Sequence, residues 1–329
     1  MTKTSTSWRA ISGAAVLAAV AWATKAEAAL ILSDTFGTST LNSAAPAAPT
    51  AISTNYEVLS TKDATASSIA AGSLKLTMAN TSSGFAEVEA LIAASPIVLA
   101  QTGDYVEVTV DFVPTGVNVL GNSTLNIGLF NSGGAPPVPG TSLNNGQLDD
   151  AGIFTTGNAA GWFGYVSRIG RVLGAASQIF TRPAQVGETT AEAQDGLFNN
   201  AGGGAFDNPT GTVLQSGGAG ATLVNGTSYT LQLRVTYDAG TTFATTSYSL
   251  SNVGGPLDSL SGVSGATTTL ATAFDAIALG FRGTDSVGPY SLDISSVKVE
   301  TNVEIVPEPI TCTLLGIGLM FVGGRRRVG

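Results

Sequence analysis

The stretch YVEVTVDF, from Tyr105 to Phe112, decides the fold class of this chain. Its apolar residues fall at every second position, and Glu107, Thr109 and Asp111 stand between them. Successive side chains of a β-strand point to opposite faces of the sheet, so this pattern places one face in a core and the other in water. The stretch therefore predicts a strand that is buried on one side only.

The same alternation recurs along the rest of the chain. The apolar sets that share a phase are Leu74, Leu76 and Met78; Leu125, Ile127 and Leu129; Tyr229, Leu231, Leu233, Val235 and Tyr237; and Ile277, Leu279 and Phe281. With 41 glycines and 13 prolines in 329 residues, turns are plentiful and long helices are unfavourable. We expect an all-β domain with long loops at 131–150 and 198–220, and a helical turn would fit only at 86–94.

The last alternating segment contains a break. Two apolar pairs are out of phase by one residue: Leu292 with Ile294, and Val297 with Val299. A β-bulge between Ser295 and Ser296 would produce this shift and keep both pairs on one face.

The first and last segments of the domain are expected to pair. Residues 33–36 lie in the N-terminal segment of the domain, and residues 292–300 are expected to form its last strand. In a jelly-roll β-sandwich the first and last strands often lie together, which hides both edges. No internal repeat is visible, so we interpret residues 29–303 as one sandwich domain.

The N-terminal residues have the three parts of a secretory signal peptide. Lys3 and Arg9 form a basic region, residues 10–23 are rich in Ala and Val, and Ala26 and Ala28 form an A-x-A cleavage site. We expect residues 1–28 to be a signal helix that is cut after Ala28. The alternative is an uncleaved N-terminal anchor, although the apolar part is short for a membrane span.

The C-terminal residues, 304–329, carry a second signal. In chain order it contains Val306, Pro307, Glu308 and Pro309, then an apolar stretch at 310–324, then Arg325, Arg326 and Arg327. The prolines stiffen and expose the backbone. As a helix, the apolar stretch would rise about 22 Å, less than the roughly 30 Å hydrocarbon core of a bilayer. The arginines are expected to stay on the cytoplasmic side.

This order of motif, short apolar helix and basic cluster resembles the PEP-CTERM sorting signal of Gram-negative bacteria that produce exopolysaccharide. The resemblance implies recognition of the motif at 306–309 by an exosortase-type membrane protease, removal of the tail, and release to or attachment at the cell surface. An ordinary short C-terminal transmembrane helix is the alternative.

The length and strand pattern of residues 30–302 resemble the concanavalin A-like lectin/glucanase superfamily, especially the LamG-like domains found ahead of PEP-CTERM tails. The resemblance implies a jelly-roll β-sandwich. A generic β-sandwich and a β-helix are the alternatives.

Charge and composition exclude several classes of function. The net charge is −9, which disfavours nucleic acid and anionic lipid as partners. The chain has no histidine, which excludes Ser-His-Asp and Cys-His catalysis and His-ligated zinc. Its only cysteine, Cys312, cannot form an internal disulfide. We interpret Cys312 as a small apolar residue, with lipidation as the alternative.

Two pairs of acidic residues are candidates for the carboxyl pair of a glycosidase. Glucanases of the superfamily place their acids along one strand as E-x-D-x-x-E, so that alternation points the first two into one cleft. Glu87-Val88-Glu89 lacks the Asp and the third acid, and Glu107 to Asp111 has the wrong spacing. Both pairs are expected to be solvated strand faces, and no hydrolytic activity is expected.

Two other groups are candidate binding residues. Trp162, Phe163, Tyr165 and Arg168 form the densest aromatic cluster, which could floor a sugar site, although alternation sends at least one set of rings to the core. Asp149 and Asp150 follow two asparagines in a polar loop and are candidate calcium ligands, with turn formation as the alternative. No other cofactor is expected.

The sequence thus predicts an exported, non-enzymatic protein of the cell surface or extracellular matrix. Its expected partners are an exosortase-type protease, the inner membrane transiently, and extracellular polysaccharide by weak contact. A secreted glycoside hydrolase and a protein-binding adhesion module are the alternatives.

Overall fold

The computed structural model describes residues 28–41, 48–60, 67–70, 72–78, 84–116, 124–132, 162–170, 176–184, 197–198, 211–218, 220–265, 270–283 and 290–304. These residues form strands, turns and bends, with no helix among them. The expected signal helix and the expected C-terminal transmembrane helix lie outside the described residues. So do Asp149 and Asp150 and the whole 306–327 sorting segment.

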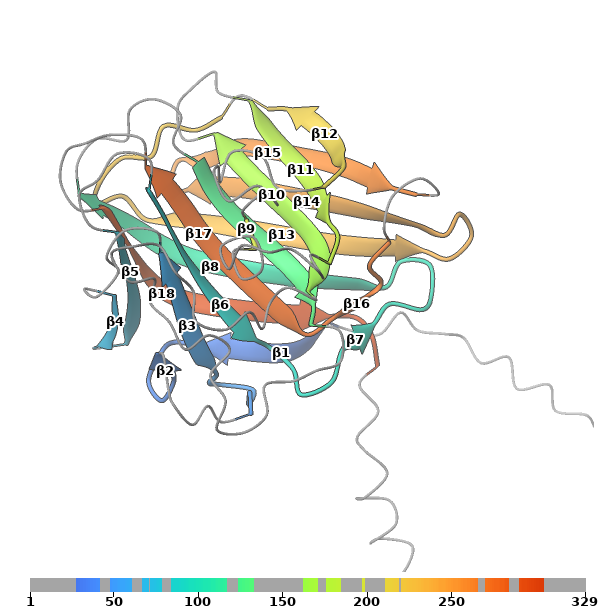
Figure 1. The fold of residues 1–329 in the computed structure, drawn as a ribbon, viewed down its shortest axis with the longest axis horizontal. Helices are drawn as coiled ribbons and strands as arrows, with labels where there is room; N and C mark the ends of the chain where they lie inside the picture. The colour runs from blue at the N-terminus through green and yellow to red at the C-terminus, as the bar shows by residue number, and fades with distance from the viewer. Residues whose placement is uncertain are drawn as a thin grey trace, which may run out of the picture.

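Two sheets of eight strands face each other across the molecule (Figure 1). The first sheet contains, in spatial order, β15 (Gly255–Ser264), β14 (Phe243–Asn252), β13 (Tyr229–Asp238), β8 (Tyr105–Gly116), β18 (Tyr290–Thr301), β5 (Ser73–Met78) and β4 (Ser68–Ala70), with β1 (Ala29–Asp34) also on β18. The second contains β12 (Val213–Gly217), β11 (Ser177–Arg182), β10 (Phe163–Gly170), β9 (Thr124–Asn131), β17 (Ala276–Gly283), β6 (Gly84–Leu91), β3 (Asn55–Ser60) and β2 (Thr40–Leu41). A short pair, β7 (Ile97–Val98) with β16 (Ala273–Phe274), closes one end.

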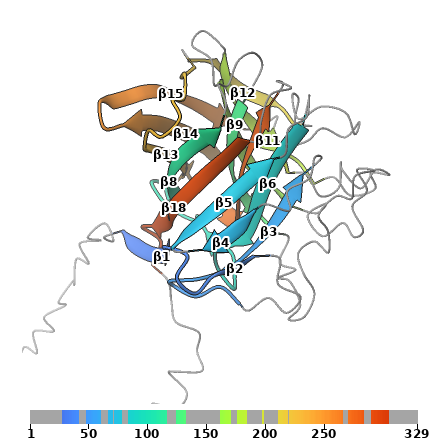
Figure 2. The same cartoon turned by 90° about the vertical axis from the view of Figure 1, so that its left-hand side faces the viewer.

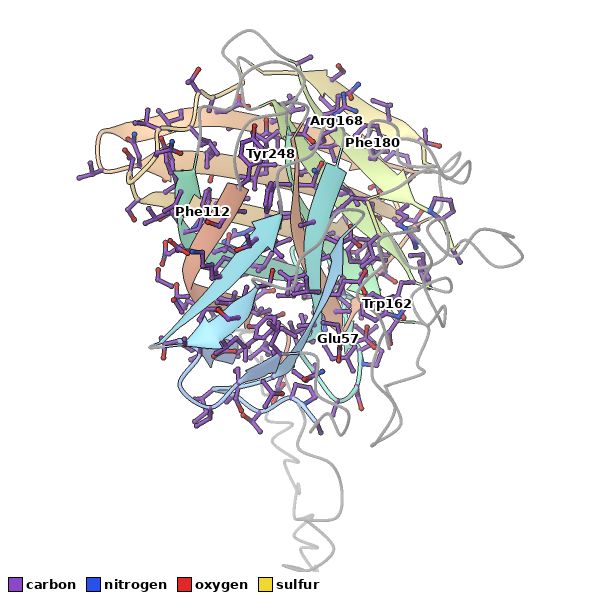
Figure 3. All side chains as sticks on the ribbon, turned by 60° about the vertical axis from the view of Figure 1, so that its left-hand side comes forward. Glu57, Phe112, Trp162, Arg168, Phe180 and Tyr248 are labelled. Carbon is purple, nitrogen blue, oxygen red and sulfur yellow. The ribbon has the colours of Figure 1, made fainter. Side chains whose placement is uncertain are left out.

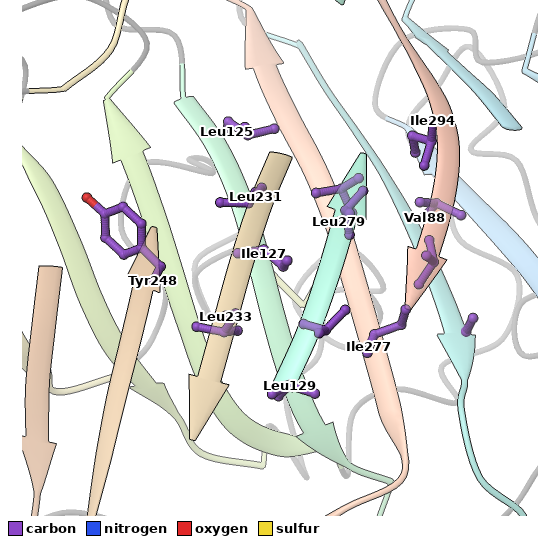
Figure 4. Close-up of a cluster of buried hydrophobic side chains, with 14 of the residues drawn as sticks. Val88, Leu125, Ile127, Leu129, Leu231, Leu233, Tyr248, Ile277, Leu279 and Ile294 are labelled. Carbon is purple, nitrogen blue, oxygen red and sulfur yellow. The ribbon is translucent and has the colours of Figure 1, made fainter. Parts of the chain in front are cut away.

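The core lies between these sheets and is built by the alternation seen in the sequence (Figure 4). The predicted inward residues of β8, β9, β13 and β17 are buried: Val106, Val108, Val110 and Phe112; Leu125, Ile127 and Leu129; Tyr229, Leu231, Leu233 and Val235; and Ile277, Leu279 and Phe281. Burying a large apolar side chain contributes roughly 1.5–3 kcal/mol to the free energy of folding, before the cost in conformational entropy is subtracted. The all-β sandwich expected from the sequence is thus confirmed for the described residues.

The bulge predicted in the last strand is confirmed. The pairing of β18 with β8 shifts register between Ile294 and Ser296. Leu292, Ile294, Val297 and Val299 are all buried despite their different phases. The extra residue therefore keeps both halves of β18 facing the core.

The predicted pairing of the first and last strands is also confirmed. β1 lies antiparallel to β18, with Ala29 opposite Thr301 and Asp34 opposite Val297 (Figure 2). The buried Asp34 carboxylate accepts hydrogen bonds from the Phe36 amide at 2.6 Å and the Tyr56 hydroxyl at 2.9 Å. Both ends of the described domain are therefore fixed at one end of the sandwich.

The edges of the two sheets meet. β12 contacts β15 at one side of the sandwich, and β2 contacts β4 at the other. At the first junction a Cβ added to Gly262 would lie 3.0 Å from Leu214 Cβ, so glycine allows this close approach. Edges that pack on each other are protected from pairing with another chain.

Residues 86–94 do not form the helical turn that the sequence allowed. Most of this segment is strand β6, which pairs with β17 on one side and with β3 on the other. The hydrogen bonds of two neighbouring strands outweigh the weak local helix preference.

Candidate functional site

A cluster of buried carboxyl groups lies on the outer face of the second sheet. In β6 the side chains of Ala86, Val88 and Ala90 enter the core, so Glu87 and Glu89 project from the opposite face. Both glutamates are 0% exposed. The expectation that they form a solvated face is therefore wrong.

The other acid pair lies where the sequence predicted, on the polar outer face of the first sheet. Glu107 is partly exposed and its Oε2 lies 2.8 Å from Arg234 Nε. Asp111 accepts hydrogen bonds from the hydroxyls of Thr230 at 2.6 Å and Ser296 at 2.7 Å. These acids take part in cross-strand pairing at the surface.

Neighbouring strands add polar groups to the buried cluster. Glu57 on β3 stands opposite Glu89, is 1% exposed, and accepts a hydrogen bond of 2.6 Å from the Asn55 amide. Gly280 on β17 stands opposite Glu87 on one side and Asn126 on the other. Because Gly280 has no side chain, the space between Glu87 and Asn126 is not filled by β17.

Phe198 and Leu197 fill this space. The Leu197 amide donates a hydrogen bond of 2.9 Å to Glu87 Oε1, and the Phe198 amide also donates to Glu87. A Cβ added to Gly280 would lie 3.0 Å from the Phe198 ring, and one added to Gly128 would lie 3.3 Å from it. The glycines form a floor on which the Phe198 ring rests.

Aromatic rings and one guanidinium border the floor. Phe130 lies 6.4 Å from Trp162 and 6.4 Å from Phe198, ring centroid to ring centroid. The buried Arg182 donates a hydrogen bond from Nη1 to the Trp162 carbonyl. A second apolar cluster thus covers the outer face; it consists of Leu91, Phe130, Trp162, Val166, Leu197, Phe198, Ala276 and Ala278.

Burial changes the acid strength of these carboxyls. Loss of solvation raises the pKa of Glu87, although hydrogen bonds from Glu89 and Leu197 and the positive charge of Arg182 oppose the rise. Burial also raises the pKa of Glu57 to about 7, against a hydrogen bond from Asn55.

The sheet divides the aromatic cluster predicted from the sequence between its two faces. Figure 3 labels two of its members, Trp162 and Arg168. Tyr165 is 0% exposed, and its hydroxyl lies 2.9 Å from Ser264 Oγ inside the core. Phe163 packs against the same core, whereas Trp162 belongs to the outer cluster and is 1% exposed. Arg168 lies 5.9 Å from the Phe180 ring centroid on the outer face, and burial lowers its pKa.

These positions argue against the expected flat sugar platform, because neither Trp162 nor Tyr165 presents a ring to solvent. The sequence reasoning also missed Phe130 and Phe198. Phe130 could have been found from the sequence. It follows Leu129 directly, so its apolar ring lies on the face that alternation assigns to water. An apolar residue in the polar phase indicates a strand covered on both sides.

Among the described residues, no group of three His, Cys, Asp or Glu side chains could hold a metal ion. Nor does any helix in this part of the chain have the length and apolarity needed to cross a bilayer.

Comparison with known proteins gives structural neighbours only. No protein family and no curated protein matches the chain. Peanut lectin in complex with a 9mer peptide has 12% identity and a TM-score of 0.40 over 76% of this chain and 93% of its own. The VIP36 exoplasmic/lumenal domain has 12% identity and a TM-score of 0.39, and the match covers 77% of this chain and 86% of that domain. Arcelin-5 from Phaseolus vulgaris has 12% identity and a TM-score of 0.36, and the match covers 75% of this chain and 92% of arcelin-5. These values assign no function to this chain, and the architecture rests on the strand pairing described above.

Proposed function

We propose that this chain is an exported, non-enzymatic protein of the cell surface or extracellular matrix that contacts carbohydrate weakly through the outer face of the second sheet. One observation supports carbohydrate binding. Carboxyl, amide and guanidinium groups lie around the glycine floor, which aromatic rings border. Sugars are bound by such sets, since hydroxyls need donors and acceptors while C–H faces need flat apolar contact. Glu87, Asn126 and Arg182 supply the polar groups and Trp162 an aromatic wall; all four are at most 2% exposed, so a sugar contacts them only after the covering residues move.

The contacts of Phe198 support the same proposal. Its ring rests on the floor as a sugar face would, and the Leu197 amide satisfies Glu87 as a hydroxyl would. A carbohydrate must displace these two residues before it binds. Because apparent affinity falls in proportion to the fraction of molecules with an open site, we propose weak binding by the unmodified chain.

The non-enzymatic part rests on the carboxyl geometry. Retaining glycosidases hold their two carboxyls about 5–5.5 Å apart, with the anomeric carbon between them. Here Glu87 and Glu89 are both 0% exposed, so the two carboxyls do not flank an accessible glycosidic bond. The absence of histidine from the chain removes the commonest alternative acid and base.

Export and sorting remain proposals drawn from the terminal sequences. The proposed cleavage after Ala28 precedes β1 directly, and the proposed sorting motif at 306–309 follows β18. Since Ala29 pairs with Thr301, both segments join the sandwich at the same end. This arrangement is compatible with sequential contact with one membrane, first through the signal peptide and then through the tail, with an exosortase-type protease as partner.

A glycan array tests the binding proposal. We expect faint signals for the unmodified protein on a subset of neutral or cationic polysaccharides and stronger signals on the same glycans for Phe198→Ala. Val253→Ala is the matched control, because Val253 is fully exposed in the turn between β14 and β15. Absence of signal for both proteins would leave the sandwich without a glycan role and favour an adhesion module.

A glycoside hydrolase is the second candidate, favoured by one observation. A general acid needs a carboxyl that stays protonated near neutral pH, and burial raises the pKa of both Glu57 and Glu87. Reproducible turnover of a β-glucan that is lost in Glu87→Gln or Glu89→Gln would replace the non-enzymatic proposal with this one.

A further inference from the structure

An apolar groove lies at the end of the sandwich where the chain leaves the domain. Its volume is about 550 Å³, within the range of sites that hold small ligands. The start of β1, residues 49–51, residues 92–98 and residues 303–304 form its walls. Leu30 and Val98 in these walls are 49% and 53% exposed. Exposed apolar side chains gathered around a hollow indicate a contact surface.

The groove also contains the exit point of the chain. Val303 and Glu304, the last residues that the structure describes, line it. The next residues of the chain are Ile305, Val306, Pro307, Glu308 and Pro309. At about 3.3–3.6 Å per residue, this five-residue segment reaches at most about 18 Å from Glu304.

The chemistry of the segment fits an apolar groove of this kind. Four of its side chains are apolar, and the prolines have no amide hydrogen that would need a partner. Proline also limits the unbound conformations, which reduces the entropy lost on docking. Glu308 can remain at the solvated rim. Because the segment is covalently tethered beside the groove, its effective concentration is in the millimolar range, and a weak contact is sufficient.

We infer that the groove is the docking site of residues 305–309 of the same chain. In the docked state the apolar side chains of this segment replace water over Leu30 and Val98, and the segment is held against the domain. A protease that cuts at these residues would have to withdraw them from the groove first. This inference does not depend on any glycan contact on the outer face of the second sheet.

Disulfide trapping tests the docking in the full-length chain. Cys312 is the only cysteine, so Cys312→Ser gives a clean background. Val98→Cys with Val306→Cys forms the test pair. Gln101→Cys with Val306→Cys forms the control pair, because Gln101 is exposed, lies three residues along the chain, and is not among the groove residues. Membranes from cells without the sorting protease are oxidised with copper phenanthroline, and disulfide formation is followed with time.

We expect the test pair to form its disulfide at least fivefold faster than the control pair. Adding Ala94→Arg, which places a charge in the groove wall, should remove this advantage. A ratio below five overturns the proposal, because a docked segment would hold position 306 beside Val98 and away from Gln101. An advantage that persists with Ala94→Arg also overturns it, since the proximity would then not depend on the groove. Resistance of the sandwich to limited proteolysis checks that each variant is folded.

Discussion

At the scale of single residues, the buried glutamates have the largest predicted effect on behaviour. Glu57 is protonated in the folded protein up to about pH 7, whereas an unfolded Glu ionises near 4.5. The folded state therefore binds more protons between these values, and stability falls as pH rises through this window. Burial acts on Glu87 in the same direction.

We predict that the free energy of unfolding, measured by urea titration, is highest near pH 4.5 and decreases toward pH 8, with Glu57 alone accounting for on the order of 3 kcal/mol. Glu57→Gln should flatten the curve, because an amide does not titrate. A stability that rises steadily from pH 5 to pH 8 would mean that these carboxyls ionise normally and are not buried.

The glycine floor gives a second prediction at this scale. A Cβ at position 280 would lie 2.8 Å from Glu87 Cβ and 3.0 Å from the Ala86 carbonyl oxygen. Since this backbone cannot yield easily, Gly280→Ala should destabilise the protein by about 1–3 kcal/mol. Gly37→Ala is the control, because no atom lies within 4 Å of the added carbon. Equal urea midpoints for the two variants would show that the floor is not closely packed.

At the scale of elements, the bulge in β18 allows a direct test of the assigned strand register. Deleting Ser295 would remove the extra residue, after which Leu292, Ile294, Val297 and Val299 alternate regularly and can all stay on the core face. We therefore predict that this deletion is tolerated and changes the free energy of unfolding by no more than about 1 kcal/mol. Deleting Lys298, an exposed residue outside the bulge, would instead turn Val299 toward solvent. We predict that this second deletion costs more than about 4 kcal/mol or prevents folding. Equal stability of the two deletion variants would contradict the assigned register.

The elements also show how far the sequence could predict the structure. Strands β8, β9, β13, β17 and β18 were readable because large apolar residues that face the core alternate with mainly polar or small residues. The exceptions are Phe130 in β9 and the phase shift at the bulge of β18. Strand β6 was not readable, because Glu87 and Glu89 have the pattern of a solvated face. Their cover includes Leu197 and Phe198, more than 100 residues later in the chain. Local alternation contains no information about such a distant contact.

At the scale of the whole molecule, the two proposed export signals join one end of the sandwich. Replacing Pro307, Glu308 and Pro309 with alanines should leave the domain folded but keep the precursor in the inner membrane of a cell that has the sorting protease. Fractionation followed by intact-mass analysis measures this. If surface-located protein still ends in Arg327-Val328-Gly329, the tail is an anchor and not a processed signal.

The central claim at this scale is that the outer face of the second sheet contacts carbohydrate at the place that Phe198 occupies. Calorimetric titration of one glycan into the unmodified protein, Phe198→Ala and Val253→Ala tests it most directly. Removing the ring should open the site, so we predict that Phe198→Ala binds at least tenfold more tightly than the unmodified protein, and that Val253→Ala binds like the unmodified protein. Affinity that is unchanged or lower in Phe198→Ala would contradict the account.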